Sequence, residues 1–239
     1  MMLENNLIQK CTCGNTTLFT ELVINGLDVI KCNECQVIHQ KLEGWAKEDY
    51  YNFYKTDYHT KYQEEKKVVT YQDRYDHDCV VANKRLASYK FTPMAVGLDI
   101  GSSNSAFVHR ALTRNLKCIG LEPGENIGDD SLTIRGTLET ADLESNHFDF
   151  VTMHDSIEHM IDVNFALDKI YKILKFNGQL ILDLPDYFIP EGAHHWKRIE
   201  HLWFFSQDQL LEILKSYRFK LMKVTTPIPG KLVFFTRKI

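Results

Sequence analysis

The sequence lacks long apolar runs and has no excess of basic charge. No run approaches the ~20 apolar residues that a membrane-spanning helix needs, and the stretch from Met1 to Asn5 does not resemble a charged-then-apolar leader. The 28 basic residues are outnumbered by 32 acidic ones, which gives a net charge of −4 and no global attraction to polyphosphate. We therefore expect a cytoplasmic protein without a membrane partner and with a small molecule, rather than nucleic acid, as its ligand.

The sequence also lacks the G-x-G-x-x-G loop of dinucleotide-binding proteins, although the flanking pattern is present. One apolar run ends at Asp99 and Gly101, and a second ends 23 positions after Asp99 at Glu122. An acid at the end of the second parallel strand can accept hydrogen bonds from both hydroxyls of a ribose. Ser103 and Ala106 replace the second and third glycines, which disfavours a pyrophosphate. The pattern predicts a nucleoside site that suits S-adenosylmethionine, whose ammonium would face Asp99.

Two stretches resemble class I S-adenosylmethionine-dependent methyltransferases, over about residues 95–184. The motif acid-x-Gly-x-Gly-x-Gly falls on 99–105, where the acid and the first glycine are kept. The run from Phe148 to His159 is similar to the family's fourth strand and leu-glu-his loop. The resemblance implies an α/β, Rossmann-like, seven-stranded sheet that is mostly parallel, with an antiparallel last strand. The cofactor-binding residues expected on these grounds are Asp99, Gly101, Ser102, Ser103, Glu122, Pro123, Thr137, Leu138, Glu139, His154 and Asp155.

Periodicity predicts the elements around these motifs independently. Apolar residues recur at helical spacing from Val163 to Leu174, and the continuously apolar run 180–182 suits a central strand. Ser206 and Gln209 form a capping-box pattern that predicts a helix start. The runs 219–224 and 231–236 flank a turn cluster rich in proline and glycine, which predicts two antiparallel strands.

Four of the six cysteines fall within the first 35 residues, as the pairs Cys11/Cys13 and Cys32/Cys35. In a reducing compartment two such pairs favour one tetrahedral zinc over disulfides. Because the first pair has a short spacing, His39 is held in reserve as a replacement ligand. We expect a zinc-ribbon module at 1–44 in which a structural Zn²⁺ stabilises a segment too small for its own core.

The segment 45–90 is crowded with tyrosines among polar residues. Aromatic rings with polar tips suit a partly wet cavity wall, although most of them could simply cover apolar surface. Tyr54 and Tyr58 are the candidates to face the transferred methyl or the acceptor, and Tyr58 is included among the candidate catalytic residues. Residues 91–239 form the predicted methyltransferase domain.

The segment 194–206 carries His194, His195, Glu200 and His201 ahead of the predicted helix. Together with the cysteine module and the tyrosine-rich stretch, its Glu-His-aromatic-Phe-Ser pattern resembles sugar C-methyltransferases, in which a Glu-His pair is implicated as the base. The resemblance implies His201 as general base, with Glu200 orienting or replacing it. The alternative is that both residues only fix the local loop by hydrogen bonds.

Histidine and carboxylate residues also alternate from His154 to His159. Adjacency of Glu158 and His159 is unfavourable for one ion, so no catalytic metal is predicted there.

Three functions stay open: a small-molecule methyltransferase acting on a sugar-like acceptor by C- or O-methylation, an RNA methyltransferase whose zinc module positions the nucleic acid, and a cofactor-binding protein without catalysis. The oligomeric state is not predicted.

Overall fold

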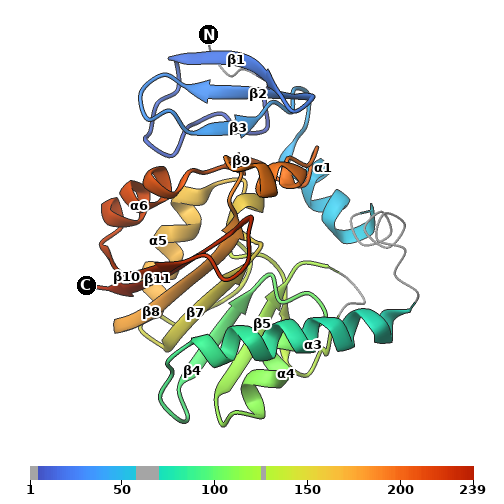
Figure 1. Ribbon diagram of the computed structural model, residues 1–239, viewed down its shortest axis with the longest axis vertical. Helices are drawn as coiled ribbons and strands as arrows, with labels where there is room; N and C mark the ends of the chain where they lie inside the picture. The colour runs from blue at the N-terminus through green and yellow to red at the C-terminus, as the bar shows by residue number, and fades with distance from the viewer. Residues whose placement is uncertain (1–4, 58–69, 125–127) are drawn as a thin grey trace.

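The computed structural model describes residues 5–57, 70–124 and 128–239, which form two sheets and the helices that cover them (Figure 1). None of the helices in these ranges is long and apolar enough to span a bilayer. The first half contains β1 (Phe19–Ile24), β2 (Leu27–Cys32), β3 (Ile38–Gln40), α1 (Lys47–Asn52), a π-helical turn (Phe53–Asp57), α3 (Tyr71–Ser88), β4 (Val96–Ile100), α4 (Ala106–Leu112) and β5 (Lys117–Glu122). The second half contains β6 (Thr133–Arg135), β7 (Phe148–His154), a 3-10 turn (Ile157–His159), α5 (Val163–Ile173), β8 (Leu174–Pro185), a 3-10 turn (Pro190–His195), β9 (Trp203–Phe204), α6 (Gln207–Ser216), β10 (Phe219–Thr225) and β11 (Lys231–Lys238).

The large sheet has seven strands in the order β10-β11-β8-β7-β4-β5-β6. The strands β8, β7, β4, β5 and β6 run parallel, whereas β11 pairs antiparallel with both β8 and β10. This arrangement confirms the predicted mostly parallel sheet with a reversed strand near its end. The order reverses direction beside β4, and such a switch point opens a crevice at the carboxyl ends of the strands.

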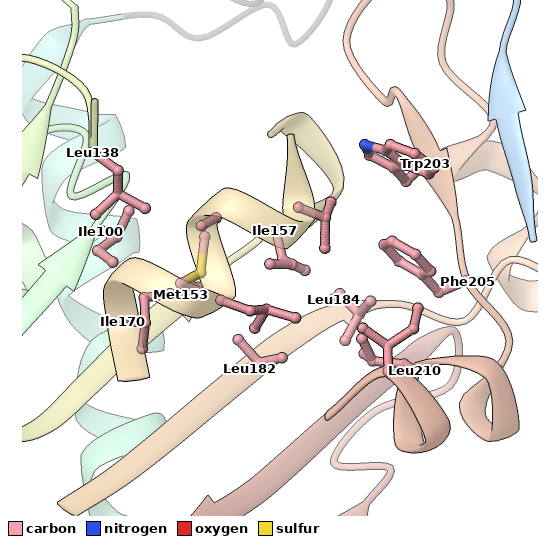
Figure 2. Packing of buried hydrophobic residues seen from close by; sticks show 14 of the residues in the cluster. Ile100, Leu138, Met153, Ile157, Ile170, Leu182, Leu184, Trp203, Phe205 and Leu210 are labelled. Carbon is pink, nitrogen blue, oxygen red and sulfur yellow. The ribbon is translucent and has the colours of Figure 1, made fainter. Parts of the chain in front are cut away.

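Helices cover both faces of this sheet because its central strands are apolar on both sides. Ile181 and Phe150 pack in one cluster with residues of α3 and α4. Leu182 packs in another cluster with residues of α5 and α6. In Figure 2 Leu182 and Leu184 lie between Met153 and Ile157 on one side and Leu210 on the other. Successive residues of one strand thus belong to opposite cores, as a sheet covered on both faces requires.

The helices begin where the sequence pattern places them. The Ser206 hydroxyl accepts a hydrogen bond from the Gln209 N–H, and the Gln209 side chain accepts one from the Ser206 N–H, which completes the predicted capping box of α6. Asp162 caps α5 through the N–H of Phe165. The five buried side chains of α5 all face the core.

The small sheet has the order β1-β2-β3-β9, so its last strand comes from the C-terminal half of the chain. It lies at the N-terminal end of the molecule, above the large sheet in Figure 1. Trp203 of β9 contacts the ring of His39 and donates its indole N–H to the carbonyl of Met160 at 2.7 Å. The side chain of Gln40 donates to the carbonyls of Lys197 and His201 at 3.0 Å each. The first 44 residues therefore hold the segment that leads into β9.

Gly97 supports a close packing in the middle of the large sheet. A Cβ at this position would lie 1.9 Å from the ring of Phe150 on the neighbouring strand β7, and that ring stacks on Phe91 at 3.9 Å. We expect Gly97→Ala to lower the free energy of unfolding by about 1–3 kcal/mol, because the strand and the ring must move apart. Urea denaturation measures the change, and Gly97→Ala combined with Phe150→Leu should recover part of it. Unchanged stability of the single variant would contradict this packing.

Candidate active site

A pocket of about 400 Å³ opens at the carboxyl ends of β4, β5 and β7. Asp99, Glu122 and His154 stand at these three strand ends, and all three line the pocket. The pocket lining contains each of the residues predicted to bind the cofactor, Asp99, Gly101, Ser102, Ser103, Glu122, Pro123, Thr137, Leu138, Glu139, His154 and Asp155. The structure thus brings the two motifs and the 136–139 turn around one cavity.

The loop after β4 keeps the backbone shape of a glycine-rich turn although it has lost most of its glycines. Gly101, Ser103 and Ser105 have φ values of 74°, 47° and 62°, which place all three in the left-handed region. For a residue with a side chain this conformation costs about 1–2 kcal/mol. Hydrogen bonds offset that cost, since Ser105 Oγ lies 2.9 Å from Thr133 Oγ1 and accepts from the Asp129 N–H at 3.0 Å. The loop therefore still presents its backbone to the pocket.

Glu122 is a buried carboxylate held by backbone donors. One oxygen accepts from the N–H of Ser103 and the other from the N–H of Gly124, both at 2.8 Å. Burial raises the pKa of Glu122, and these two N–H groups act in the opposite direction. The hydrogen bonds fix the carboxylate at the pocket wall, where its remaining lone pairs can accept further hydrogen bonds from a ligand.

Asp99 is buried beside Thr152 and His154. It accepts hydrogen bonds from the Thr152 hydroxyl at 2.7 Å and from Nδ1 of His154 at 3.0 Å. Nε2 of His154 lies 3.0 Å from the hydroxyl of Tyr89. Burial, followed by the nearby Arg85, lowers the pKa of His154. With a neutral ring, Nδ1–H donates to Asp99 and Nε2 accepts from Tyr89.

Helix α3 supplies a wall that the sequence analysis did not assign. Arg74, Asp78 and Arg85 line the pocket from this helix. Arg74 donates to Ser103 Oγ at 3.2 Å, and Arg85 forms an ion pair of 2.7 Å with Asp183. These residues are spaced so that they fall on one face of a helix. That helical spacing is the feature of the sequence that could have predicted this wall of the pocket.

A second group of pocket residues comes from the 3-10 turn Ile157–His159 and the segment before β9. His159, His194, His195 and His201 all line the pocket here. The rings of His159 and His201 lie 4.8 Å apart, and Nδ1 of His201 is 2.8 Å from the hydroxyl of Tyr187. Burial lowers the pKa of His201 well below its usual value, and the charge on Lys197 acts in the same direction. His201 is therefore a neutral imidazole at neutral pH.

Glu200 does not join His201 in the pocket lining. Its carboxylate pairs with Lys197 at 2.9 Å, and its carbonyl accepts from the hydroxyls of Tyr50 and Tyr54 at 3.1 Å each. Adjacent side chains diverge in the irregular backbone that follows Ile199, which has a φ of 70°. The expectation that Glu200 orients His201 or acts in its place is not matched by a contact of its carboxylate with His201; its backbone carbonyl instead bonds to Tyr50, Tyr54 and His159, which line the pocket.

The tyrosine-rich segment contributes Tyr50, Tyr51 and Tyr54 to the pocket lining. The hydroxyl of Tyr54 also contacts Nδ1 of His159. The prediction that Tyr54 faces the cavity agrees with this placement. Tyr58 lies outside the described residues.

Glu158 precedes His159 in the same turn and is completely buried. Neither of its carboxylate oxygens has a hydrogen-bond partner within the described part of the chain. Burial raises the pKa of Glu158 to about 8. Such a group is costly to bury alone.

The four cysteines of the first module converge. The sulfur atoms of Cys11, Cys13, Cys32 and Cys35 all lie within 4.8 Å of one another, with Cys11 and Cys35 3.3 Å apart. His39 is not part of this group, which corrects its role as a reserve ligand. Its ring is buried between Phe19 and Trp203, where burial lowers the pKa to about 4.

Comparisons with known proteins give the family and the fold. The profile of a family described as "Methyltransferase domain" matches residues 71–224. No curated protein matches the chain. The solved structure of a 1,6-didemethyltoxoflavin-N1-methyltransferase from Burkholderia thailandensis, with bound 1,6-didemethyltoxoflavin and S-adenosylhomocysteine, is 15% identical with a TM-score of 0.61, covering 86% of this chain and 97% of that one.

Two further solved structures have the same fold. A possible histamine N-methyltransferase from Thermotoga maritima is 23% identical with a TM-score of 0.52, covering 67% of this chain and 88% of that one. A phosphoethanolamine N-methyltransferase from Haemonchus contortus, in complex with S-adenosylmethionine, is 15% identical with a TM-score of 0.56, covering 68% of this chain and 52% of that one.

Proposed function

The chain belongs to the methyltransferase-domain family, and from this premise we propose that it transfers a methyl group from S-adenosylmethionine to a small, sugar-like acceptor. The observation that carries the proposal is the pocket in which Asp99 and Glu122 stand at the ends of adjoining parallel strands. These are the positions that a nucleoside-binding sheet uses for its ligand.

The residues present fit S-adenosylmethionine. Glu122 offers acceptors for the two ribose hydroxyls, and Asp99 offers a negative charge for the ammonium of the methionine part. The turn at Thr137, Leu138 and Glu139 offers backbone groups and a carboxylate beside the adenine. Bound S-adenosylmethionine supplies a methyl group already activated on a sulfonium, so the protein mainly has to align the acceptor and exclude water.

The charge of Glu122 gives a test of the cofactor site. We expect Glu122→Gln to weaken S-adenosylmethionine binding by about 10- to 100-fold, because a charge-assisted hydrogen bond contributes about 1.5–3 kcal/mol. Affinity of the wild type should fall as the pH drops through the raised pKa of Glu122, since the protonated carboxyl accepts fewer hydrogen bonds, and the variant should not show this step. Calorimetry measures both the loss of affinity in the variant and the pH dependence of affinity in the wild type.

Glu144→Gln is the matched control, because Glu144 is exposed and does not line the pocket. Equal affinities of the wild type and Glu122→Gln would remove Glu122 from the site.

The proposal of a sugar-like acceptor rests on two features. One is the polar side chains of the second group of pocket residues and the nearby tyrosines, and the other is the sequence pattern around Glu200 and His201. Tyrosine hydroxyls and imidazoles can donate to and accept from the hydroxyls of a sugar. A carbon or hydroxyl acceptor must lose a proton during methylation. His201 is neutral and can take that proton, whereas Glu200 supports the site through its carbonyl, which accepts from Nδ1 of His159 at 2.6 Å.

Substitution of His201 and substitution of Glu200 should affect turnover to different extents. We expect His201→Asn to lower kcat by about 10²–10⁴, the usual size of general-base assistance, with unchanged affinity for S-adenosylmethionine. Glu200→Gln keeps the carbonyl and should lower kcat much less. Release of S-adenosylhomocysteine with a panel of nucleotide-linked deoxysugars measures turnover. An unaffected kcat in His201→Asn would exclude it as the base.

We also propose that the four cysteines bind one structural Zn²⁺. Four sulfur ligands at about 2.3 Å from a tetrahedral ion lie about 3.8 Å apart, and the sulfurs here need only small shifts to reach this spacing. Four thiolates close the coordination sphere, so the ion would hold the turns of the small sheet together rather than take part in catalysis.

Removal of one sulfur tests the zinc proposal. We expect wild-type protein to contain one zinc per chain and Cys32→Ser to lose it, with a lower melting temperature because the metal stabilises the folded module. Cys79→Ser, outside the cluster, should change neither value. Elemental analysis and thermal denaturation make the measurements, and a wild-type protein that binds no zinc would contradict the proposal.

A further inference from the structure

Three potential ligand side chains meet at the edge of the pocket, where His159 and His201 line it and Glu158 lies buried behind them; we call this region, lined also by His194 and His195, the acceptor end. Glu158, His159 and His201 each place one ligand atom within 4.8 Å of the other two. They come from two segments about 40 residues apart in sequence. The hydrogen bond from the N–H of Leu202 to the carbonyl of Glu158, at 2.9 Å, joins these two segments.

No hydrogen bond in the described part of the chain accounts for the burial of the Glu158 carboxylate. It is fully buried and both oxygens are unpartnered within the described residues. Buried carboxylates are normally paired, hydrogen-bonded or bound to a metal. An unsatisfied carboxyl group beside two imidazoles therefore indicates a missing positive ligand.

Both imidazoles have a hydrogen-bond partner on Nδ1, as metal-ligating histidines commonly have. Nδ1 of His159 is 2.6 Å from the carbonyl of Glu200, and Nδ1 of His201 is 2.8 Å from the hydroxyl of Tyr187. In metal sites the second ring nitrogen commonly donates to a carbonyl or similar acceptor, which fixes the ring and directs Nε2 at the ion. Both rings have such a partner on the same nitrogen.

The donor set defines the kind of ion. Two imidazole nitrogens and one carboxylate suit divalent first-row transition metals and leave further coordination positions open. Ligand atoms bound at about 2.0–2.2 Å lie roughly 3–4.4 Å apart, so the three groups need to close only slightly. His159 and His201 line the pocket, so the open positions would face the acceptor region.

We propose that Glu158, His159 and His201 bind a divalent transition-metal cation at the acceptor end of the pocket. This differs from the expectation that the adjacency of Glu158 and His159 is unfavourable for one ion, because the turn that holds them brings a ligand atom of each within 4.8 Å of one on His201. The proposal deepens the proposed function by adding a cation to the same site. It rests on the proposed function and replaces its general base: with the cation bound, His201 is a ligand, and the cation instead of His201 would activate an acceptor hydroxyl.

Cobalt binding tests the site without methyl donor or acceptor, so the result does not depend on the proposed reaction. Co²⁺ is titrated into the zinc-containing protein and followed by visible absorption. We expect one equivalent with weak bands and no sulfur-to-cobalt charge transfer, since the ligands contain no thiolate. Glu158→Gln and His201→Asn should weaken binding by more than the roughly 10–100-fold typical of losing an outer-shell partner.

His194→Asn is the matched control, because His194 lines the pocket but is not one of the three ligands. The affinity of this variant for Co²⁺ should equal that of the wild type. Paramagnetic broadening of the His159 and His201 ring signals by Co²⁺ in wild-type protein locates the ion even if a variant fails to fold. Cobalt bound only by thiolates, no cobalt binding, or equal affinities of the wild type and Glu158→Gln would overturn the proposal.

Discussion

Two carboxylates are buried at the ends of neighbouring parallel strands, where backbone and side-chain donors hold them, and the rest of the pocket is arranged around this pair. Glu122 accepts from two N–H groups, and Asp99 accepts from Thr152 and His154. A buried charge is tolerated only with such partners. Because β4 and β5 are parallel and in register, both acids emerge at one edge of the sheet. The pocket and the two acids in its wall follow from that edge.

The small N-terminal sheet contributes to the same site from the opposite side. Strand β9 extends this sheet, and Gln40 bonds to the carbonyls of Lys197 and His201. The segment with the catalytic candidate is thus fixed by residues more than 150 positions away in sequence. A zinc ion that stabilises the small sheet would thereby support the position of His201 without touching the substrate.

Much of the large sheet was predictable, because parallel central strands and amphipathic helices have strong periodicity and α6 has a capping box. The acids at the strand ends were predictable for the same reason. The direction of the Glu200 side chain was not, since it is set by a left-handed residue at Ile199 that no pattern indicates. The pairing of β9 with β3 and the approach of Glu158 to His201 are long-range contacts, which local sequence cannot reveal. The face of α3 that carries Arg74 and Arg85 had a helical signal that was overlooked.

The central claim is that this pocket holds the nucleoside of S-adenosylmethionine between Glu122 and Asp99. A crystal structure with bound S-adenosylhomocysteine tests it most directly. The account predicts both ribose hydroxyls within hydrogen-bond distance of the Glu122 carboxylate and the amino group on the side of Asp99. A nucleoside bound elsewhere, or a ribose without contact to Glu122, would contradict it.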